Sequence, residues 1–180
     1  MLMRLRNEDG FLLIELIAAS VIITVALLAL LGAYDQAWFS LHSGAKNSSA
    51  GIIANNQLEL YASLQYSSIG LDATTLTSTK ASDANYSTDE AALPVGTGVT
   101  ATDATISNCG TAAQCVPVQT VRGADGKNYK LETFIRSMTN PAAASGSGWT
   151  EKVVTVIVRD LSASGYPKVV TLQTAFDSGP

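Results

Sequence analysis

An unbroken apolar stretch near the N-terminus decides the fold. Residues 8–36 read EDGFLLIELIAASVIITVALLALLGAYDQ. From Phe11 to Ala33 the chain holds 23 residues, and only Glu15 among them is charged. As a helix this stretch is about 35 Å long, which is enough to cross a hydrocarbon core of about 30 Å. The sequence therefore predicts a transmembrane helix over residues 11–34.

A cleaved secretory signal is the main alternative for this stretch. Its apolar region would be about 7–15 residues long and would end in small residues at a cleavage site. This run is longer, and the nearest such site, Leu-Gly-Ala at 31–33, has a bulky leucine where a small residue is required. Arg4 and Arg6 precede the run, and no basic residue follows it before Lys46. Since basic residues stay in the cytoplasm, we expect the N-terminus inside and the C-terminal bulk outside.

The single acid of the run, Glu15, needs an explanation. An ionised carboxylate within the apolar part of a bilayer costs roughly 2.5–3.5 kcal/mol or more. No Lys, Arg or His lies between residues 7 and 41 to pair with it. One interpretation places Glu15 near the interface, where its carboxylate reaches water. In the other, the chain is cut after Gly10, and the new amine of Phe11 in a neighbouring helix pairs with Glu15.

The order of Gly10, Phe11 and Glu15, between a polar leader and a long apolar helix, resembles the class III signal of type IV prepilins. The resemblance is close over residues 4–34 and only architectural beyond residue 66. It implies that a membrane aspartyl peptidase removes the leader, residues 1–10, and methylates the new N-terminus at Phe11. It also implies that Glu15 takes part in subunit docking. Many pilins carry a helix-kinking proline in this segment, whereas this chain has none before residue 94.

Residues 35–66 are predicted to continue the helix as an amphipathic segment. Ile53, Leu60 and Leu64 follow helical spacing, and Leu41 fits a similar face. We expect this apolar stripe to pack on a globular domain.

The C-terminal third, residues 116–180, is predicted to form a sheet. Four runs rich in β-branched or alternating residues read as strands, at 115–121, 128–137, 151–160 and 167–176. In the second run one face carries Tyr129, Leu131, Thr133 and Ile135, and the other carries Lys130, Glu132 and Arg136. The Asp-Gly pair at 125–126 predicts a hairpin turn. Residues 141–148 read as a flexible loop. Three or four antiparallel strands with one face on the helix predict an α+β fold, the ladle of the pilins.

Residues 67–115 form a Ser/Thr/Ala-rich connection without a strong period. We expect it to be variable and mostly irregular, with room for a short strand or helix. Cys109 and Cys115 lie at its end, and an even cysteine count in an exported region predicts one disulfide. Two free buried thiols are the alternative.

The composition argues against several other functions. A net charge of −4 and few basic residues disfavour nucleic-acid binding. The single histidine, His42, reads as a surface residue, and with no other histidine the chain offers neither a zinc cluster nor a base for a catalytic serine. The acids Asp83, Asp89, Glu90 and Asp103 match no calcium loop and are expected on a solvated surface. We therefore expect no enzyme, no metal and no cofactor.

The expected function is that of a structural subunit of a type IV pilus-like filament, a minor pilin. Alternatives are a type II secretion pseudopilin and a singly anchored extracellular binding domain that does not polymerise; an anchored enzyme is disfavoured. Implied partners are other pilin subunits, the prepilin peptidase, the inner-membrane assembly machinery and the membrane. The expected location is the cytoplasmic membrane, with the domain outside, and then a surface filament.

Processing after Gly10 is directly testable. In cells that contain the peptidase, the intact mass of the membrane-extracted chain should correspond to a start at Phe11, with one added methyl group. A chain that keeps residues 1–10 in such cells contradicts the prediction.

Overall fold

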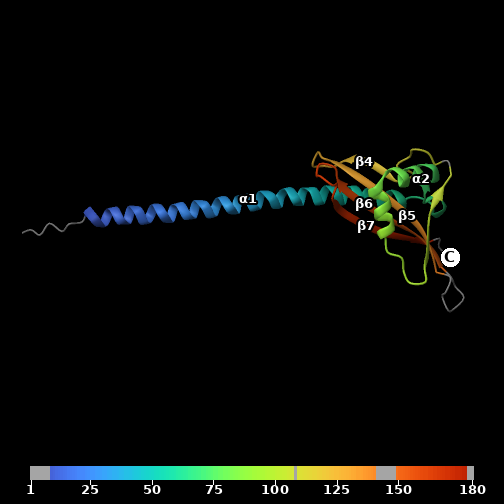
Figure 1. Cartoon of the computed structure of the whole chain (residues 1–180), viewed down its shortest axis with the longest axis horizontal. Coiled ribbons are helices and arrows are strands. Elements are labelled where there is room, and N and C mark those ends of the chain that lie inside the picture. The colour runs from blue at the N-terminus through green and yellow to red at the C-terminus, as the bar shows by residue number, and fades with distance from the viewer. Residues whose placement is uncertain (1–8, 108, 141–148, 178–180) are drawn as a thin grey trace, which may run out of the picture. The chain divides into compact units, whose positions relative to one another are not determined.

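The computed structural model describes residues 9–107, 109–140 and 149–177 (Figure 1). The chain forms two compact units, Met1–Gly44 and Ala45–Pro180. The helix α1 (Asp9–Ala62) belongs to the first unit in its N-terminal part and to the second in its C-terminal part. The predicted loop at 141–148 lies outside the described residues.

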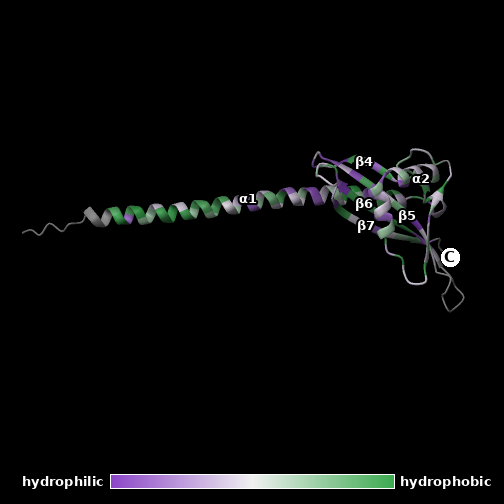
Figure 2. Cartoon of the chain, in the orientation of Figure 1, coloured by the Kyte–Doolittle hydropathy of each residue, from purple (hydrophilic) through white to green (hydrophobic). Residues whose placement is uncertain are grey.

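Helix α1 has 54 residues and contains no proline. Its N-terminal part is almost uniformly hydrophobic, and polar residues become frequent only further along (Figure 2). Among the described residues, it is the one helix long and apolar enough to cross a membrane. It ends at Ala62, four residues before the predicted end, and a short 3₁₀ helix, η1 (Tyr66–Ser68), follows.

The second unit is built on an antiparallel sheet of five strands. They are β2 (Thr100–Asp103), β4 (Val118–Arg122), β5 (Asn128–Asn140), β6 (Trp149–Asp160) and β7 (Lys168–Asp177). Four of the strands lie in the order β2-β5-β6-β7. The remaining strand, β4, pairs with β5, as β2 does. All four predicted strands are present. The fifth, β2, comes from the segment expected to be irregular, as does a small parallel pair of β1 (Leu71–Asp72) and β3 (Thr105–Ile106). The long helix packed on an antiparallel sheet confirms the predicted α+β fold.

The turn between β4 and β5 forms where the Asp-Gly pair predicts it. The Gly123 amide donates to the Lys127 carbonyl at 2.8 Å, and Gly126 has a φ of 79°. Glycine adopts this left-handed conformation without steric cost, so the turn fixes the register of the hairpin.

One face of the sheet packs against the C-terminal part of α1. The helix buries a stripe of residues at helical spacing: Ala50, Ile53, Ala54, Gln57 and Tyr61. The predicted stripe is wrong in two members, since Leu41 is 70% exposed and Leu60 only half-buried. Two alanines on the stripe allow the helix axis to lie close to the sheet. The buried face of the helix is therefore centred on the alanines and not on the leucines.

Two helices lie within residues 67–115, the segment that was expected to be mostly irregular. They are α2 (Ala73–Ser82) and α3 (Ala84–Ala92). Asp72 caps the first by accepting from the Thr75 amide at 2.9 Å, and Asp83 caps the second by accepting from the Asn85 and Tyr86 amides. Aspartate is among the best N-cap residues, so these two acids indicate where the two helices begin. The helices were not predicted because the segment has no apolar period.

The second face of the sheet is covered by α3. The Tyr86 ring stacks on Phe134 with centroids 4.3 Å apart, and its hydroxyl donates to the Thr133 carbonyl at 2.8 Å. Alternation in β5 predicts Lys130 and Glu132 on the face opposite Leu131, and they lie there. Alternation does not predict that this face is covered, and Glu132 has no exposed surface.

Six charged side chains on this face form a chain of charges in which positive and negative groups alternate. Its order is Asp83, Lys130, Glu132, Arg159, Asp89 and Lys168. Lys130 Nζ lies 2.7 Å from Glu132 Oε1, Arg159 Nε lies 2.9 Å from Glu132 Oε2, and Lys168 Nζ lies 2.7 Å from Asp89 Oδ1. The three acids and three bases balance, so this chain of charges has no net charge. It fastens α3 to β5, β6 and β7.

A separate ion pair fastens α1 to the end of β6. Lys46 Nζ lies 2.9 Å from Asp160 Oδ2. Burial favours the neutral carboxyl, but hydrogen bonds from the Ser162 hydroxyl, Lys46 and the Ser162 amide outweigh it and lower the pKa of Asp160 to about 2. Asp160 therefore stays ionised in the folded domain at any pH at which the chain functions.

Removing the charge of Glu132 should strongly destabilise the domain. Glu132→Gln leaves Arg159 and Lys130 short of a buried partner, and breaking such a pair costs about 3–5 kcal/mol. Asp103→Asn is the matched control, because Asp103 pairs with Lys80 at the surface, where a pair contributes about 1 kcal/mol or less. Urea unfolding of the full chain in detergent, followed by near-ultraviolet circular dichroism, measures both losses. Equal small losses would show that the buried chain contributes little.

Candidate functional site

The apolar part of α1 is exposed on all sides within the chain. From Leu13 to Leu41 its large side chains have more than half of their surface uncovered. They are Leu13, Ile14, Leu16, Ile17, Val21, Ile22, Ile23, Val25, Leu27, Leu28, Leu30, Leu31, Tyr34, Trp38, Phe39 and Leu41. Burying a side chain of this kind contributes about 1.5–3 kcal/mol, so covering the whole set is worth on the order of tens of kcal/mol. This surface therefore requires an apolar environment that the chain itself does not supply.

The polar side chains of the apolar run differ in whether they have a hydrogen-bond partner. The Ser20 hydroxyl donates to the Ile17 carbonyl at 2.8 Å, and the Thr24 hydroxyl donates to the Ser20 carbonyl at 2.7 Å. Both groups are thus satisfied by the helix backbone. Glu15 is exposed, and no hydrogen bond or ion pair reaches its carboxylate within the described part of the chain. It is the polar group of the run that needs an external partner.

The residues of the prepilin-like motif lie together at the N-terminal end of α1. Gly10 and Phe11 are helical, and Phe11 precedes Glu15 by about 6 Å along the axis. The amine of a chain starting at Phe11 would therefore lie about one turn from Glu15 of the same helix. Pairing with the Glu15 of another copy requires a shift along the axis of about this size. Cleavage, methylation and docking at these residues remain predictions.

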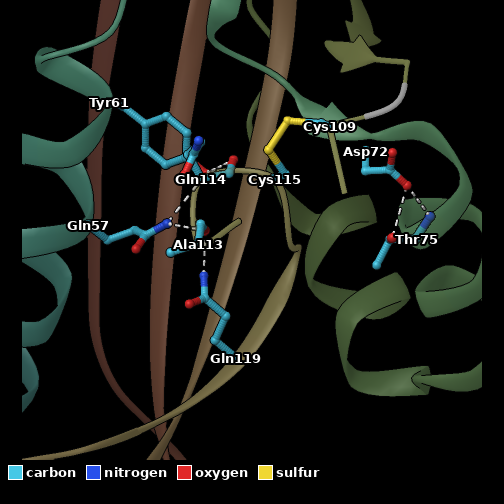
Figure 3. Close-up of a disulfide and its surroundings, with 9 residues drawn as sticks. All are labelled: Gln57, Tyr61, Asp72, Thr75, Cys109, Ala113, Gln114, Cys115 and Gln119. Atoms are coloured by element: carbon cyan, nitrogen blue, oxygen red, sulfur yellow. Dashed lines mark hydrogen bonds between the residues drawn. A yellow bond between two sulfur atoms is a disulfide. The ribbon is translucent and has the colours of Figure 1, made fainter. Parts of the chain in front are cut away.

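The predicted disulfide is confirmed. Cys109 and Cys115 are bridged, with their Cα atoms 5.7 Å apart, inside the usual range for disulfides. Figure 3 shows two side chains of α1 pointing toward the loop that this bridge closes. The Tyr61 hydroxyl donates to the Gln114 carbonyl at 2.7 Å, and Gln57 Nε2 donates to the Ala113 carbonyl at 3.3 Å.

The same loop is also held from the sheet side. Gln119 Nε2 donates to the Ala113 carbonyl at 2.7 Å, and the Asp72 amide donates to the Cys115 carbonyl at 2.9 Å. Sequence reasoning missed this contact between helix and loop. The available signal was Gln57 and Tyr61, two polar side chains four residues apart on a helix stripe that otherwise holds alanine and isoleucine.

The acids considered for calcium are engaged with cations. Asp83 and Asp89 belong to the buried chain of charges, and Glu90 and Asp103 both pair with Lys80. Asp89 is only 5% exposed, so the expectation of a solvated acidic surface is wrong for this residue. In the described ranges no group of three His, Cys, Asp or Glu side chains is arranged to hold a metal ion.

A small cleft lies between α1 and the β4–β5 hairpin. Its volume is about 220 Å³, below the roughly 300–1,000 Å³ of typical ligand pockets. Its lining includes Ile52 and Gln57 from the helix, and Gln119, Arg122 and Leu131 from the hairpin. The cleft lacks a cluster of titratable groups and supports no catalytic assignment.

No protein-family model matches the chain, and no curated protein or solved structure shows significant similarity to it.

The contact between α1 and the disulfide loop should be coupled to the bridge. Replacing Cys109 and Cys115 by serine should cost about 2 kcal/mol of folding free energy, because the closed loop is short. Tyr61→Phe removes the hydrogen bond to Gln114 and should cost about 1 kcal/mol in the bridged protein and less without the bridge. Urea unfolding of the four proteins in a double-mutant cycle measures this coupling. Additive losses would show that the loop keeps its place on α1 without the disulfide.

Proposed function

We propose that this chain is a structural subunit of a type IV pilus-like filament and that it assembles through the N-terminal part of α1. The observation that carries the proposal is an apolar helix surface, exposed on all sides, that holds one carboxylate with no partner among the residues that the structure describes. A lipid anchor explains the apolar surface alone. Assembly with copies or relatives of this chain explains both the surface and the acid.

The apolar surface suits two environments in succession. In the membrane, lipid chains cover it. In a filament, neighbouring helices cover it, and small side chains let helices approach closely. The run contains such residues throughout: Ala18, Ala19, Ser20, Ala26, Ala29 and Gly32. The helix can therefore exchange lipid for protein without exposing its apolar surface to water.

In a filament, Glu15 is drawn away from water among apolar helices and needs a cation. An ionised carboxylate deep in hydrocarbon costs roughly 2.5–3.5 kcal/mol. A cation about 4 Å away contributes about 4 kcal/mol at an effective dielectric constant of 20. The two energies are similar in size, so an amine at Phe11 of an adjacent subunit offsets the cost. The pairing also selects one axial register between subunits.

Among filament subunits we favour a minor pilin, because the C-terminal third of the chain forms three long strands, β5, β6 and β7. A type II secretion pseudopilin has the same requirements for its helix. A singly anchored binding domain that does not polymerise needs the helix but has no use for Glu15. The proposal requires as partners the membrane, the prepilin peptidase, the inner-membrane assembly machinery and other pilin subunits. It also requires that the domain lies outside the cytoplasmic membrane.

Neutralising Glu15 tests the proposal. Glu15→Gln keeps the size and polarity of the side chain and removes its charge. It should leave membrane insertion and cleavage after Gly10 intact and should reduce the amount of the chain in sheared filaments at least about tenfold, as expected when an interaction of 1.4 kcal/mol or more is lost. Glu15→Leu should insert at least as well and should assemble equally poorly.

The matched control is Thr24→Val, in the same helix. The Thr24 hydroxyl is satisfied by the Ser20 carbonyl, so its removal should change neither insertion nor assembly. Immunoblots of membranes and of sheared filaments measure both steps. Wild-type incorporation of both Glu15 variants would show that Glu15 has no docking role and only lies near the interface. Absence of the wild-type chain from sheared filaments would favour the singly anchored domain.

A further inference from the structure

Three rings lie along one stripe of α1 just beyond the apolar run. Tyr34 and Trp38 are stacked, with centroids 6.5 Å apart and planes 19° apart. The His42 ring meets Trp38 edge-on at 5.0 Å. The spacing of four residues places the rings one above another on the helix surface. All three are exposed, Tyr34 to 66% and Trp38 to 56%.

The chemistry of this stripe differs from that of the run before it. Each ring has an apolar body and a polar edge. Within the described residues, neither the Tyr34 hydroxyl nor the Trp38 indole N–H donates a hydrogen bond. Such side chains are favoured where an apolar region meets a polar one, because ring and polar edge are then both satisfied. The headgroup region of a bilayer provides this boundary.

We propose that the stripe Tyr34–Trp38–His42 is a lipid-interface anchor on the exported side of the membrane and that it fixes the depth of the helix. The anchor rests on the membrane step of the proposed function, and its occupant is the headgroup region of the bilayer. The neighbouring polar residues Asp35 and Gln36 agree with this level, since they end the apolar run within the same turn.

The anchor determines where Glu15 lies before assembly. Tyr34 follows Glu15 by 19 residues, or about 28 Å of helix. The hydrocarbon core is about 30 Å thick. With Tyr34 at the outer boundary, Glu15 therefore lies at the cytoplasmic boundary, within reach of water and headgroups. The carboxylate is solvated while the subunit waits in the membrane and loses that solvation only when the helix is drawn outward.

Depth-dependent quenching of single tryptophans tests the anchor. Trp38 and Trp149 are the two tryptophans of the chain, so Trp149→Phe leaves Trp38 as the sole emitter. The full chain is reconstituted, at a low protein-to-lipid ratio, in phosphatidylcholine vesicles whose acyl chains carry bromine either near the glycerol or near the chain end. Trp38 should be quenched roughly twofold more by the shallow bromines, since it lies about 6 Å beyond Tyr34, on the headgroup side of the core boundary.

Two reporters complete the depth profile. In chains with Trp149→Phe and with Trp38→Tyr, which keeps a ring with a polar edge in the anchor, Leu16→Trp should report a shallow position and Val25→Trp a deep one. Both sites are exposed on the helix, so the substitutions disturb no packing. Deep quenching at position 16 would place Glu15 inside the core and overturn the inferred depth. Deep quenching of Trp38, or none, in a chain that resists carbonate extraction would overturn the anchor.

A matched pair of variants tests the positioning role. Tyr34→Ala with Trp38→Ala should abolish the preference of the position-16 reporter for shallow bromines, because the helix then occupies several depths. Phe39→Ala removes an aromatic ring from another face of the same segment and should leave the preference unchanged. Equal profiles in both variants overturn the anchor. A wild-type chain that carbonate extracts from the vesicles contradicts the membrane step of the proposed function as well, and so is distinguished from failure of the anchor alone.

Discussion

Continuity of the backbone hydrogen bonds in α1 is the constraint on which the rest of the chain depends. An unsatisfied backbone group in hydrocarbon costs several kcal/mol, so a single spanning segment must be helical throughout. Here the same helix continues, without proline, from the apolar run into the folded domain and supplies the stripe against which the sheet packs. The domain therefore has no independent central helix. Its core is assembled around the continuation of an element whose other part is apolar and long enough to span a membrane.

The second face of the sheet is specified by charge instead of apolar area. Helix α3 contributes one buried aromatic ring, Tyr86, and contacts an alternating series of six charged groups, of which Lys168 at one end is partly exposed. Buried pairs of this kind add little net stability compared with apolar packing, but each is costly to break. Each partner of Glu132 and Arg159 accepts only one geometry, so the series fixes the position of α3 on strands β5, β6 and β7. Such a surface tolerates a segment of low hydrophobicity, which is what the Ser/Thr/Ala-rich composition of residues 67–115 requires.

The successes and errors of the sequence analysis follow from the same physics. The apolar run, the four strands and the disulfide are local signals: a long run, a period of two and a cysteine count. The burial of Glu132 could not be predicted, because alternation identifies two faces of a strand without saying what covers each. The stripe on α1 was misplaced at Leu41 because small residues such as Ala50 and Ala54 carry little hydrophobic signal but set the closest approach. Glu15 was recognisable because the surrounding sequence offers it no partner, whereas the contacts of Gln57 and Tyr61 depend on a loop more than fifty residues away.

The closed loop between Cys109 and Cys115 has a mechanical consequence. A force applied to α1 enters the domain through the side chains that join them, and two of these, Gln57 and Tyr61, bind the loop. Without a covalent closure, six residue steps of backbone extend to roughly 20 Å. The bridge holds their ends 5.7 Å apart. The loop therefore contains almost no extensible length, and a pull passed on by Gln57 or Tyr61 reaches β4, which begins three residues after Cys115, without first extending the loop.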